Sequence, residues 1–294
     1  MMYMVVFNKF LVDKYKGHTT AELTEEKMKS LIRDSLKLTF QKIFNILEWN
    51  QDTQTDILFA KDGYRLWRKD RLFKEYKAHR KPARDASTVD FDLVFEVFDN
   101  IWKELKAILP FRFITLDGIE TDDIIYETIQ KEYDKYDKFQ IYSADGDFVQ
   151  ILRHDKVELY NPRILEFKNP KDCEFELFEK LIRGDKSDGI PNIYSDTITE
   201  RQKPILTTRI KNWYSNKNEF KEFLKHEPKE VQKRFIRNKR LIDMRDIPDD
   251  VKNKIHKAID VPRTKFDLRL YLKVAVDNHL QDMEDKAGSI PQWI

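Results

Sequence analysis

Short apolar runs alternate with longer stretches of helical periodicity between residues 22 and 143, and this alternation constrains the fold most strongly. The apolar runs lie at 55–60, 111–116 and 139–143. Apolar side chains recur at helical spacing over 22–49, 90–109 and 121–135. Strands that alternate with helices indicate an α/β fold with a central, mostly parallel sheet flanked by helices. Ligands bind such sheets beyond the carboxyl ends of the strands, so we expect a functional site there.

The strand signals fade beyond about residue 170, where Lys-rich helical segments continue to the C-terminus. We place a boundary near residue 165, which predicts an α/β domain over 1–165 and a helical domain over 166–294. No apolar run approaches the roughly 20 residues of a membrane span, and the opening residues lack the features of a signal peptide. The one cysteine, Cys173, excludes an internal disulfide and fits a reducing cytoplasm.

Four acidic segments stand at the expected strand ends or in the helical half. They are Asp62, 120–123 (Glu-Thr-Asp-Asp), 145–147 (Asp-Gly-Asp) and 185–188 (Asp-Lys-Ser-Asp). Taken singly, each has an ordinary explanation as a turn or as acids at a helix N-terminus. Together they predict a carboxylate-rich site for two Mg²⁺ ions, with Mn²⁺ as a substitute, and argue against zinc.

Residues 61–84 hold ten Lys or Arg against three acids, interleaved with Trp67, Phe73 and Tyr76. The whole chain carries a net charge of only +2, so local charge must indicate any nucleic acid partner. Basic side chains neutralise phosphates and aromatic rings stack on unpaired bases, which makes this segment a candidate contact surface. The alternative is a solvated helix face with the three aromatic side chains packed beneath it.

Several sequence blocks resemble those of the 5′-nuclease superfamily, which includes flap endonucleases and polymerase-linked 5′-exonucleases. Residues 67–80 resemble its basic arch segment, 143–150 (SADGDFVQ) its S-x-D-x-D-F-x-Q block, and 184–191 (GDKSDGIP) its G-D-x-S-D-N-I-P block. Residues 120–123 resemble its E-A-D-D, with Thr121 in place of alanine. Within the superfamily the likeness is greatest to the ribonuclease H type of T-even-like bacteriophages, in order and spacing over most of the chain.

The resemblance implies a fold and a task. The fold is a PIN-like α/β catalytic domain, a basic helical arch, and a helical DNA-binding domain with a helix–three-turn–helix segment after Gly184. The task is 5′ to 3′ cleavage of RNA–DNA hybrids, 5′ flaps or nicked duplex DNA during phage DNA replication, as exonuclease, flap endonuclease or ribonuclease H. The resemblance also implies a monomer in the host bacterial cytoplasm, without membrane association, with a single-stranded-DNA-binding protein or sliding clamp as partner.

The resemblance assigns roles to individual residues. The first, catalytic Mg²⁺ site takes Asp62, Glu120, Asp122 and Asp123. The second site takes Asp145, Asp147, Asp185 and Asp188, partly through waters. Lys77 and Arg80 grip the scissile phosphate, and Asp122 is essential for hydrolysis. The remaining substrate contacts are Arg65, Arg68, Lys69, Tyr76 and Lys81.

The chain departs from the family pattern in three places. Gly189 stands where the family usually has Asn, and Asp62 lies one residue closer to the following aromatic than the pattern has it. The family opens with a buried strand that carries a metal-binding Asp. Here residue 1 is expected to fall inside the following helix, which predicts that the strand and its aspartate are absent. A start codon assigned too late is the favoured explanation, with a fragment or a degenerate enzyme as the alternatives. A second interpretation therefore stays open, a catalytically impaired protein that binds branched DNA. An acidic metal-storage protein would not explain the basic segment.

Overall fold

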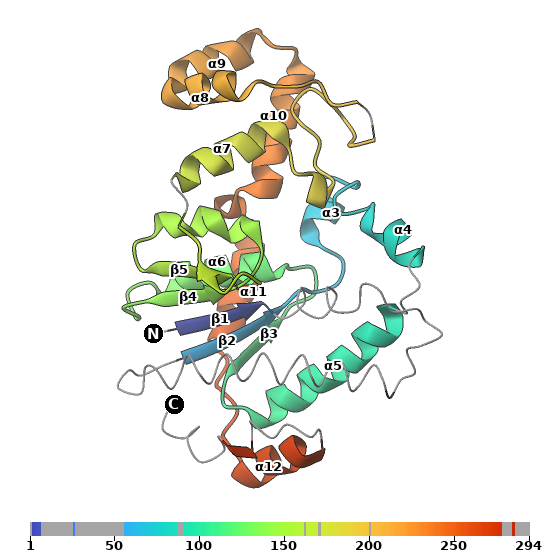
Figure 1. Cartoon of the computed structure of the whole chain (residues 1–294), viewed down its shortest axis with the longest axis vertical. Coiled ribbons are helices and arrows are strands. Elements are labelled where there is room, and N and C mark those ends of the chain that lie inside the picture. The colour runs from blue at the N-terminus through green and yellow to red at the C-terminus, as the bar shows by residue number, and fades with distance from the viewer. Residues whose placement is uncertain are drawn as a thin grey trace.

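The computed structural model describes residues 2–6, 26, 56–86, 91–161, 163–169, 172–199, 201–277 and 284–285. Six strands form one sheet in the order β3-β2-β1-β4-β5-β6 (Figure 1). Their bounds are β1 Met2–Val6, β2 Asp56–Lys61, β3 Arg112–Thr115, β4 Phe139–Tyr142, β5 Val157–Asn161 and β6 Glu166–Phe167. Among these strands β6 alone pairs antiparallel, so the predicted mostly parallel sheet is confirmed.

Strand β1 lies in the middle of the sheet, where we had expected a strand to be missing. It pairs in parallel with β2 and β4, with Met4 opposite both Leu58 and Ile141. The prediction of an absent first strand is therefore wrong. A strand in the interior of a parallel sheet needs no alternation of polar and apolar residues, and a short apolar run looks alike in a helix and a strand. The sequence of β1, MYMVV, contains no carboxylate, so this strand does not carry the aspartate of the family pattern.

Two of the predicted helices correspond to α5 (Phe91–Ile108) and α6 (Thr121–Glu132). Helix α5 packs on the edge strand β3, where the rings of Trp102 and Phe113 meet edge to face at 5.1 Å. The helix predicted over 22–49 lies outside the described residues, except for Glu26, which is helical. The basic segment forms two short helices joined by turns, α3 (Trp67–Arg71) and α4 (Arg80–Asp85).

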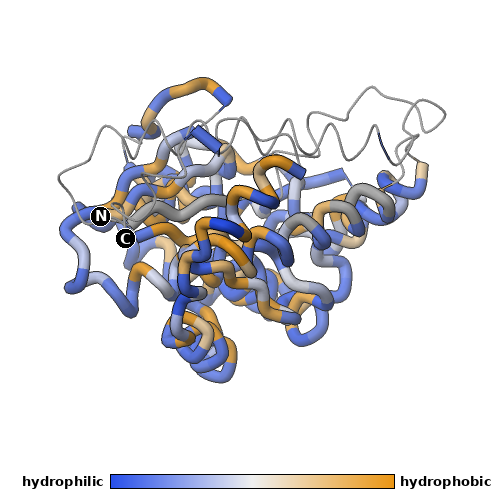
Figure 2. The backbone as a smooth tube through the Cα atoms, turned by 90° about the horizontal axis from the view of Figure 1, so that it is seen from below, coloured by the Kyte–Doolittle hydropathy of each residue, from blue (hydrophilic) through white to orange (hydrophobic). Residues whose placement is uncertain are grey.

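The described chain beyond residue 170 is helical, as predicted, and it is preceded by two strands, β5 and β6, which the sequence did not reveal. Its helices are α7 Cys173–Arg183, α8 Thr207–Ser215, α9 Lys217–His226, α10 Lys229–Ile242, α11 Asp249–Ile259 and α12 Leu268–Asp277. Helices α8 and α9 stand at the end of the molecule far from the sheet (Figure 1). Hydrophobic and hydrophilic residues alternate along the helices, as amphipathic helices require (Figure 2).

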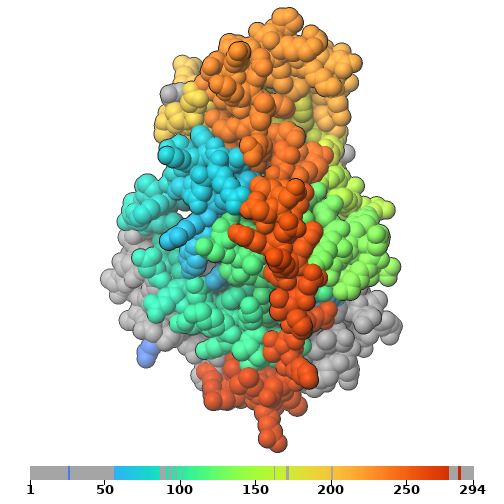
Figure 3. Space-filling model, turned by 180° about the vertical axis from the view of Figure 1, so that it is seen from behind, coloured from blue at the N-terminus to red at the C-terminus, as the bar shows by residue number. Residues whose placement is uncertain are grey.

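The C-terminal helices return to the sheet. Figure 3 shows α10, α11 and α12 running along one face of the molecule, from the helical end across the sheet domain. Val251, Ile255 and Ile259 of α11 belong to the same buried core as Leu58 and Ile141 of the sheet. The boundary near residue 165 stays a prediction, but α11 packs with the first part of the chain rather than with α8 and α9.

Candidate functional site

Acidic side chains from three separate segments converge at the carboxyl edge of the sheet. A cavity of about 20 Å³ is lined by Asp122 from the start of α6, Asp147 from the loop after β4, and Asp185 and Asp188 from the turn after α7. We call it the acid cavity. About 10–15 Å³ suffices for one water molecule, so the acid cavity has room for a single small ion or water.

The turns that present these acids are built from their own side chains. Asp145 caps the 3-10 helix Gly146–Arg153 by accepting the amide of Asp147 at 3.1 Å. Asp185 accepts the amide of Ser187 at 2.8 Å, which closes the turn over residues 185–188. Short Asp side chains bond to backbone amides two residues on, which is why these sequences form turns.

The electrostatics of the acid cavity favour a cation. Burial raises the pKa of Asp122 well above its ordinary value, and the neighbouring carboxylates of Asp145 and Asp147 raise it further. Burial also raises the pKa of Asp147, although the ammonium of Lys180 opposes the shift. Crowded carboxylates that resist ionisation gain most from a positive ion, and all the donors are oxygen atoms. The residues present therefore fit a divalent ion such as Mg²⁺ or Mn²⁺.

Two lysines supply positive charge from within the chain. Lys180 donates to Asp147 and, at 3.0 Å, to Asp185. Lys77 donates to Glu120 and lies 3.6 Å from Asp188. Among the residues that the structure describes, no three acidic, His or Cys side chains already form a metal cluster. A divalent ion would therefore have to displace these ammonium groups. The role of Lys180 was missed because it lies inside an ordinary amphipathic helix.

Arg68, which also lines the acid cavity, forms a buried network with Asp123. The guanidinium donates to Glu120 at 2.8 Å and to the two oxygens of Asp123 at 2.8 and 2.7 Å. The indole of Trp67 donates to Asp123 at 2.8 Å, and Asp123 is 0% exposed. Both oxygens of Asp123 are thus occupied, and it does not line the acid cavity, which argues against the predicted role as a metal ligand. The burial of Arg68 likewise argues against the predicted substrate contact.

Glu120 is held ionised by two cations. Burial would raise the pKa of its carboxyl, but the charges of Lys77 and Arg68 outweigh burial and lower the pKa to about 2. The hydroxyl of Tyr76 lies 3.1 Å from Glu120 and 3.1 Å from Asp188, so Tyr76 links the two acids. Tyr76 is 3% exposed, which argues against the predicted substrate contact for this side chain as well.

The base of the basic segment docks onto the turn that carries Asp188. The backbone amide of Lys77 donates to the carbonyl of Asp188 at 2.8 Å, and Arg80 donates to the carbonyl of Ser187 at 3.0 Å. Lys77 adopts a φ of 54°, a left-handed conformation that is uncommon for a residue with a side chain. Gly189 has a φ of +74°, and a Cβ there would lie 3.0 Å from the carbonyl oxygen of Glu75. The close approach and the left-handed backbone together explain glycine at this position.

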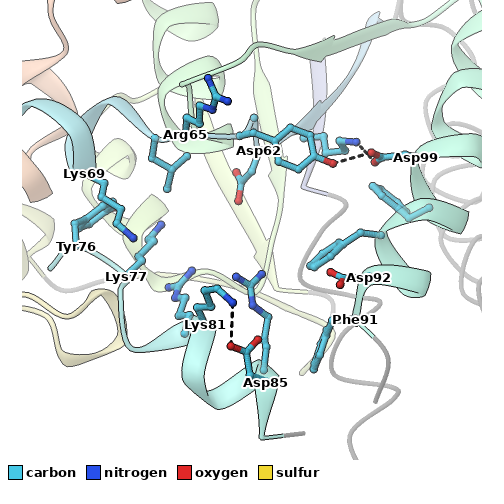
Figure 4. A pocket seen from close by; sticks show the side chains of 18 residues that line it. Asp62, Arg65, Lys69, Tyr76, Lys77, Lys81, Asp85, Phe91, Asp92 and Asp99 are labelled. Atoms are coloured by element: carbon cyan, nitrogen blue, oxygen red, sulfur yellow. Dashed lines mark hydrogen bonds and ion pairs between the residues drawn. The ribbon is translucent and has the colours of Figure 1, made fainter. Parts of the chain in front are cut away.

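A much larger cavity, of about 820 Å³, lies between α4 and α5, and we call it the basic cavity (Figure 4). Figure 4 shows Lys69, Lys77 and Lys81 on one side and Phe91 and Asp92 on the other. Its lining residues are Lys61, Asp62, Gly63, Tyr64, Arg65, Leu66, Lys69, Tyr76, Lys77, Arg80, Lys81, Arg84, Asp85, Phe91, Asp92, Phe95, Phe98 and Asp99.

The basic cavity gathers the remaining predicted residues. Arg65, Lys69 and Lys81 all line it, as does Asp62, whose carboxylate accepts the amide of Thr121 at 2.8 Å. Asp62 therefore faces a different cavity from the other acids. Lys77 lines the basic cavity and also touches Glu120 and Asp188, so it connects the two cavities.

The aromatic residues of the basic segment are not available for stacking. Trp67 and Tyr76 are 4% and 3% exposed, and the ring of Phe73 is covered by the guanidinium of Arg237 at 4.7 Å. Trp67 and Tyr76 are therefore packed beneath the segment, as the alternative interpretation has it, whereas the cations Arg65, Lys69 and Lys81 line the basic cavity. Phe91 and Phe95 of α5 line the basic cavity instead. Their helical spacing resembles that of core residues, and for this reason the sequence alone does not reveal their exposure to the cavity.

Residues 12–179 match the family described as "5′-3′ exonuclease, N-terminal resolvase-like domain". The chain is 30% identical over 204 residues to ribonuclease H of Enterobacteria phage T4, a match that covers 67% of this chain and 65% of that enzyme. It thus spans a little under two thirds of that relative. It is also 26% identical over 263 residues to a 5′-3′ exonuclease of Buchnera aphidicola subsp. Acyrthosiphon pisum, covering 83% of this chain and 87% of the relative.

The fold is also found in a solved phage structure. A bacteriophage T5 protein co-crystallised with metal ions superposes with a TM-score of 0.61 at 18% identity, over 99% of each chain. A T5 flap endonuclease in complex with DNA and metal ions superposes with a TM-score of 0.62 at 17% identity, over 99% of each chain. None of the helices that the structure describes has the length and apolar character needed to cross a membrane.

Proposed function

Because the chain belongs to the 5′-3′ exonuclease family, we propose that it is a divalent-metal-dependent nuclease that hydrolyses phosphodiester bonds near the 5′ ends of nucleic acid strands. One observation carries this proposal. Carboxylates from three separate segments meet in one cavity, and Lys77 links that cavity to the large basic one. A buried set of acids beside a basic surface is what metal-assisted cleavage of a polyanion requires.

The residues divide into metal-binding and phosphate-binding groups. Asp122, Asp147, Asp185 and Asp188 line the acid cavity and would hold the cation, with Glu120 and Asp145 beside them, whereas Asp62 lines the basic cavity. A divalent ion there supplies positive charge for the phosphate and makes a water molecule more acidic. Lys77 and Arg80 are placed to exchange their bonds to Glu120 and Asp188 for bonds to the scissile phosphate. Asp123 is left out of this set.

We infer the substrates from the names of the relatives, which indicate RNA–DNA hybrids, 5′ ends and flaps. One relative is a ribonuclease H, another a 5′-3′ exonuclease, and the T5 flap endonuclease was crystallised with DNA and metal ions. We infer a role in phage DNA replication, with Mg²⁺ as the ion, Mn²⁺ as its substitute, and a monomer as the working form. A single-stranded-DNA-binding protein or a sliding clamp is the partner expected for such a task.

A second candidate function is binding of branched DNA without cleavage. The central strand β1, MYMVV, brings no carboxylate to the carboxyl edge of the sheet, and this observation favours the second candidate. The crowded acids around Asp122 favour the first, because a binding protein has no need of them.

Cleavage of a labelled 5′-flap duplex and of an RNA–DNA hybrid separates the two candidates. We expect 5′ fragments with Mg²⁺ and none in EDTA. Asp122→Asn is the matched control, because it keeps the shape of the side chain, removes the charge, and guards against contaminating nucleases. Tight binding of branched DNA without Mg²⁺-dependent cleavage would replace the first candidate with the second.

A further inference from the structure

The basic cavity has two chemically different walls. Helix α4 and the residues before it provide cations, and Arg65, Lys69 and Arg84 form no ion pair with any residue that the structure describes. Helix α5 provides the rings of Phe91 and Phe95, whose centroids lie 6.3 Å apart with 33° between the ring planes. The two rings therefore make a short, nearly continuous aromatic surface opposite the cations.

The aromatic wall remains open to a ligand. Phe91 and Phe95 are partly exposed, whereas Phe98, one turn further along α5, is 3% exposed and lies beneath the ammonium of Lys61 at 5.3 Å. The guanidinium of Arg84 stands 5.8 Å from the ring centre of Phe95. A flat group that slides over Phe95 would lie between an aromatic face and a cation.

These features fit an unpaired nucleotide. Its phosphate would meet Arg65, Lys69 or Arg84, and its base would lie on an aromatic ring. A volume of about 820 Å³ falls within the roughly 300–1,000 Å³ of ligand pockets. A duplex keeps its base faces stacked inside the helix, so only a single strand offers them to a side chain.

The position of the basic cavity next to the acid cavity indicates the path of the bound nucleic acid strand. Lys77 and Arg80 line the basic cavity and contact Asp188 of the acid cavity, so a strand with its scissile phosphate on Lys77 continues into the basic cavity. We propose that Phe95, with Phe91 beside it, is the stacking surface for a base of the unpaired 5′ strand. This inference rests on the proposed function, because it takes the acid cavity as the site of cleavage.

The test compares two 5′ flaps with the same phosphates, one with bases and one made of abasic nucleotides. Binding to the full chain is measured by fluorescence anisotropy in EDTA, where hydrolysis does not interfere. The wild-type chain should bind the flap with bases more tightly than the abasic flap. Phe95→Leu, which keeps apolar bulk but loses the aromatic face, should weaken binding of the flap with bases by about fivefold or more and leave the abasic flap unchanged. Phe95→Trp should retain the preference.

Phe167→Leu is the matched control, because Phe167 is 53% exposed on β6, at the other edge of the sheet from α5. It should bind both flaps as the wild-type chain does. Equal affinity of the wild-type chain for the two flaps would overturn the proposal. An equal loss for both flaps in Phe95→Leu would overturn it too, because that pattern reports general damage to the fold.

Cleavage of a nicked duplex without a flap is measured separately on the wild-type chain. If the chain cleaves nothing but still prefers the flap with bases, the proposed nuclease function is refuted and the proposed stacking surface is supported. If the chain cleaves the nicked duplex but binds both flaps equally, the nuclease function is supported and the stacking surface is refuted. The two failures are therefore distinguishable.

Discussion

Replacing Arg68 with methionine should lower the free energy of unfolding by about 3–5 kcal/mol, because it strips two buried carboxylates of a shared cation. The guanidinium lies 2.8 Å from Glu120 and 2.7 Å from Asp123, and the three side chains are 4%, 2% and 0% exposed. Glu120 keeps Lys77, whereas among the described side chains Asp123 keeps only the indole of Trp67, so most of the cost falls on Asp123. Urea unfolding followed by circular dichroism should show a lower midpoint with an unchanged slope.

Arg71, on the same short helix, gives the matched control. Its guanidinium also holds a carboxylate with two bonds, at 2.9 and 2.8 Å from Asp250, but the two side chains are 46% and 54% exposed. Exposed pairs contribute about 0–1 kcal/mol, so Arg71→Met should change the free energy of unfolding by less than about 1 kcal/mol. Adding Asp123→Asn to Arg68→Met should recover part of the loss. Equal losses in the two single variants would refute the argument that burial sets the strength of the Arg68 pair.

Four further outcomes are expected. Millimolar Mg²⁺ or Mn²⁺ should raise the melting temperature, because an ion stabilises the ionised form of Asp122, whose pKa is raised by burial and then by the neighbouring carboxylates; the rise should shrink in Asp122→Asn, as calorimetry would show. Lys77→Ala should lower single-turnover cleavage by orders of magnitude while gel shifts show nearly unchanged duplex affinity, and the reverse pattern would contradict its role at the phosphate. Gly184→Ala should destabilise more than Gly189→Ala in thermal unfolding, because a Cβ at Gly184 would lie 2.2 Å from a carbonyl oxygen, against 3.0 Å at Gly189. The carboxyl of Glu120 has its pKa lowered from 4.5 to about 2, so its contribution to stability is present above pH 4.5 and is lost as the pH falls through 2. In metal-free Glu120→Gln, the free energy of unfolding should therefore fall by roughly 3 kcal/mol less than in the wild-type chain as the pH is lowered from 4.5 to 2. An unchanged dependence on pH would count against the pairing of Glu120 with Lys77 and Arg68.

The α/β part of the fold could be predicted because its elements have clear periods. Strands β2, β3 and β4 are short apolar runs with turn residues after them, and α5 and α6 have unbroken helical spacing. Strand β5 was missed because its residues, VELYN, are only partly apolar, and β6 is two residues long. Their pairing comes from contacts across the sheet, which a local pattern does not reveal.

The acid cavity could be predicted in composition but not in geometry. Four of the eight predicted ligands line the cavity. Asp122 and Asp147 do so because β3 and β4 end at one edge of the sheet, and the turn after α7 brings Asp185 and Asp188 to the same place. Asp122 and Asp123 are neighbours on a helix, where successive side chains point about 100° apart, so only one of them can face the cavity. Hydrogen bonds from Arg68 and Trp67 hold Asp123 away from the cavity, so that Asp122 faces it. Both donors lie more than fifty residues from Asp123 in sequence, which is why the local pattern does not reveal this.

The sequence of strand β1 bears on the affinity that we expect of the acid cavity for a divalent ion. It lies between β2, which ends beside Asp62, and β4, which ends before Asp145, so its carboxyl end is the central position of the edge. No acid in MYMVV stands there. The charge of the ligands sets the affinity of an oxygen site for a divalent ion, so a site with one carboxylate fewer binds the ion more weakly. Burial, and then the neighbouring carboxylates, still raise the pKa of Asp122, so a cation would stabilise its ionised form. Because β1 offers no carboxylate at this position, we expect the proposed site to require more Mg²⁺ than a site with an acid there.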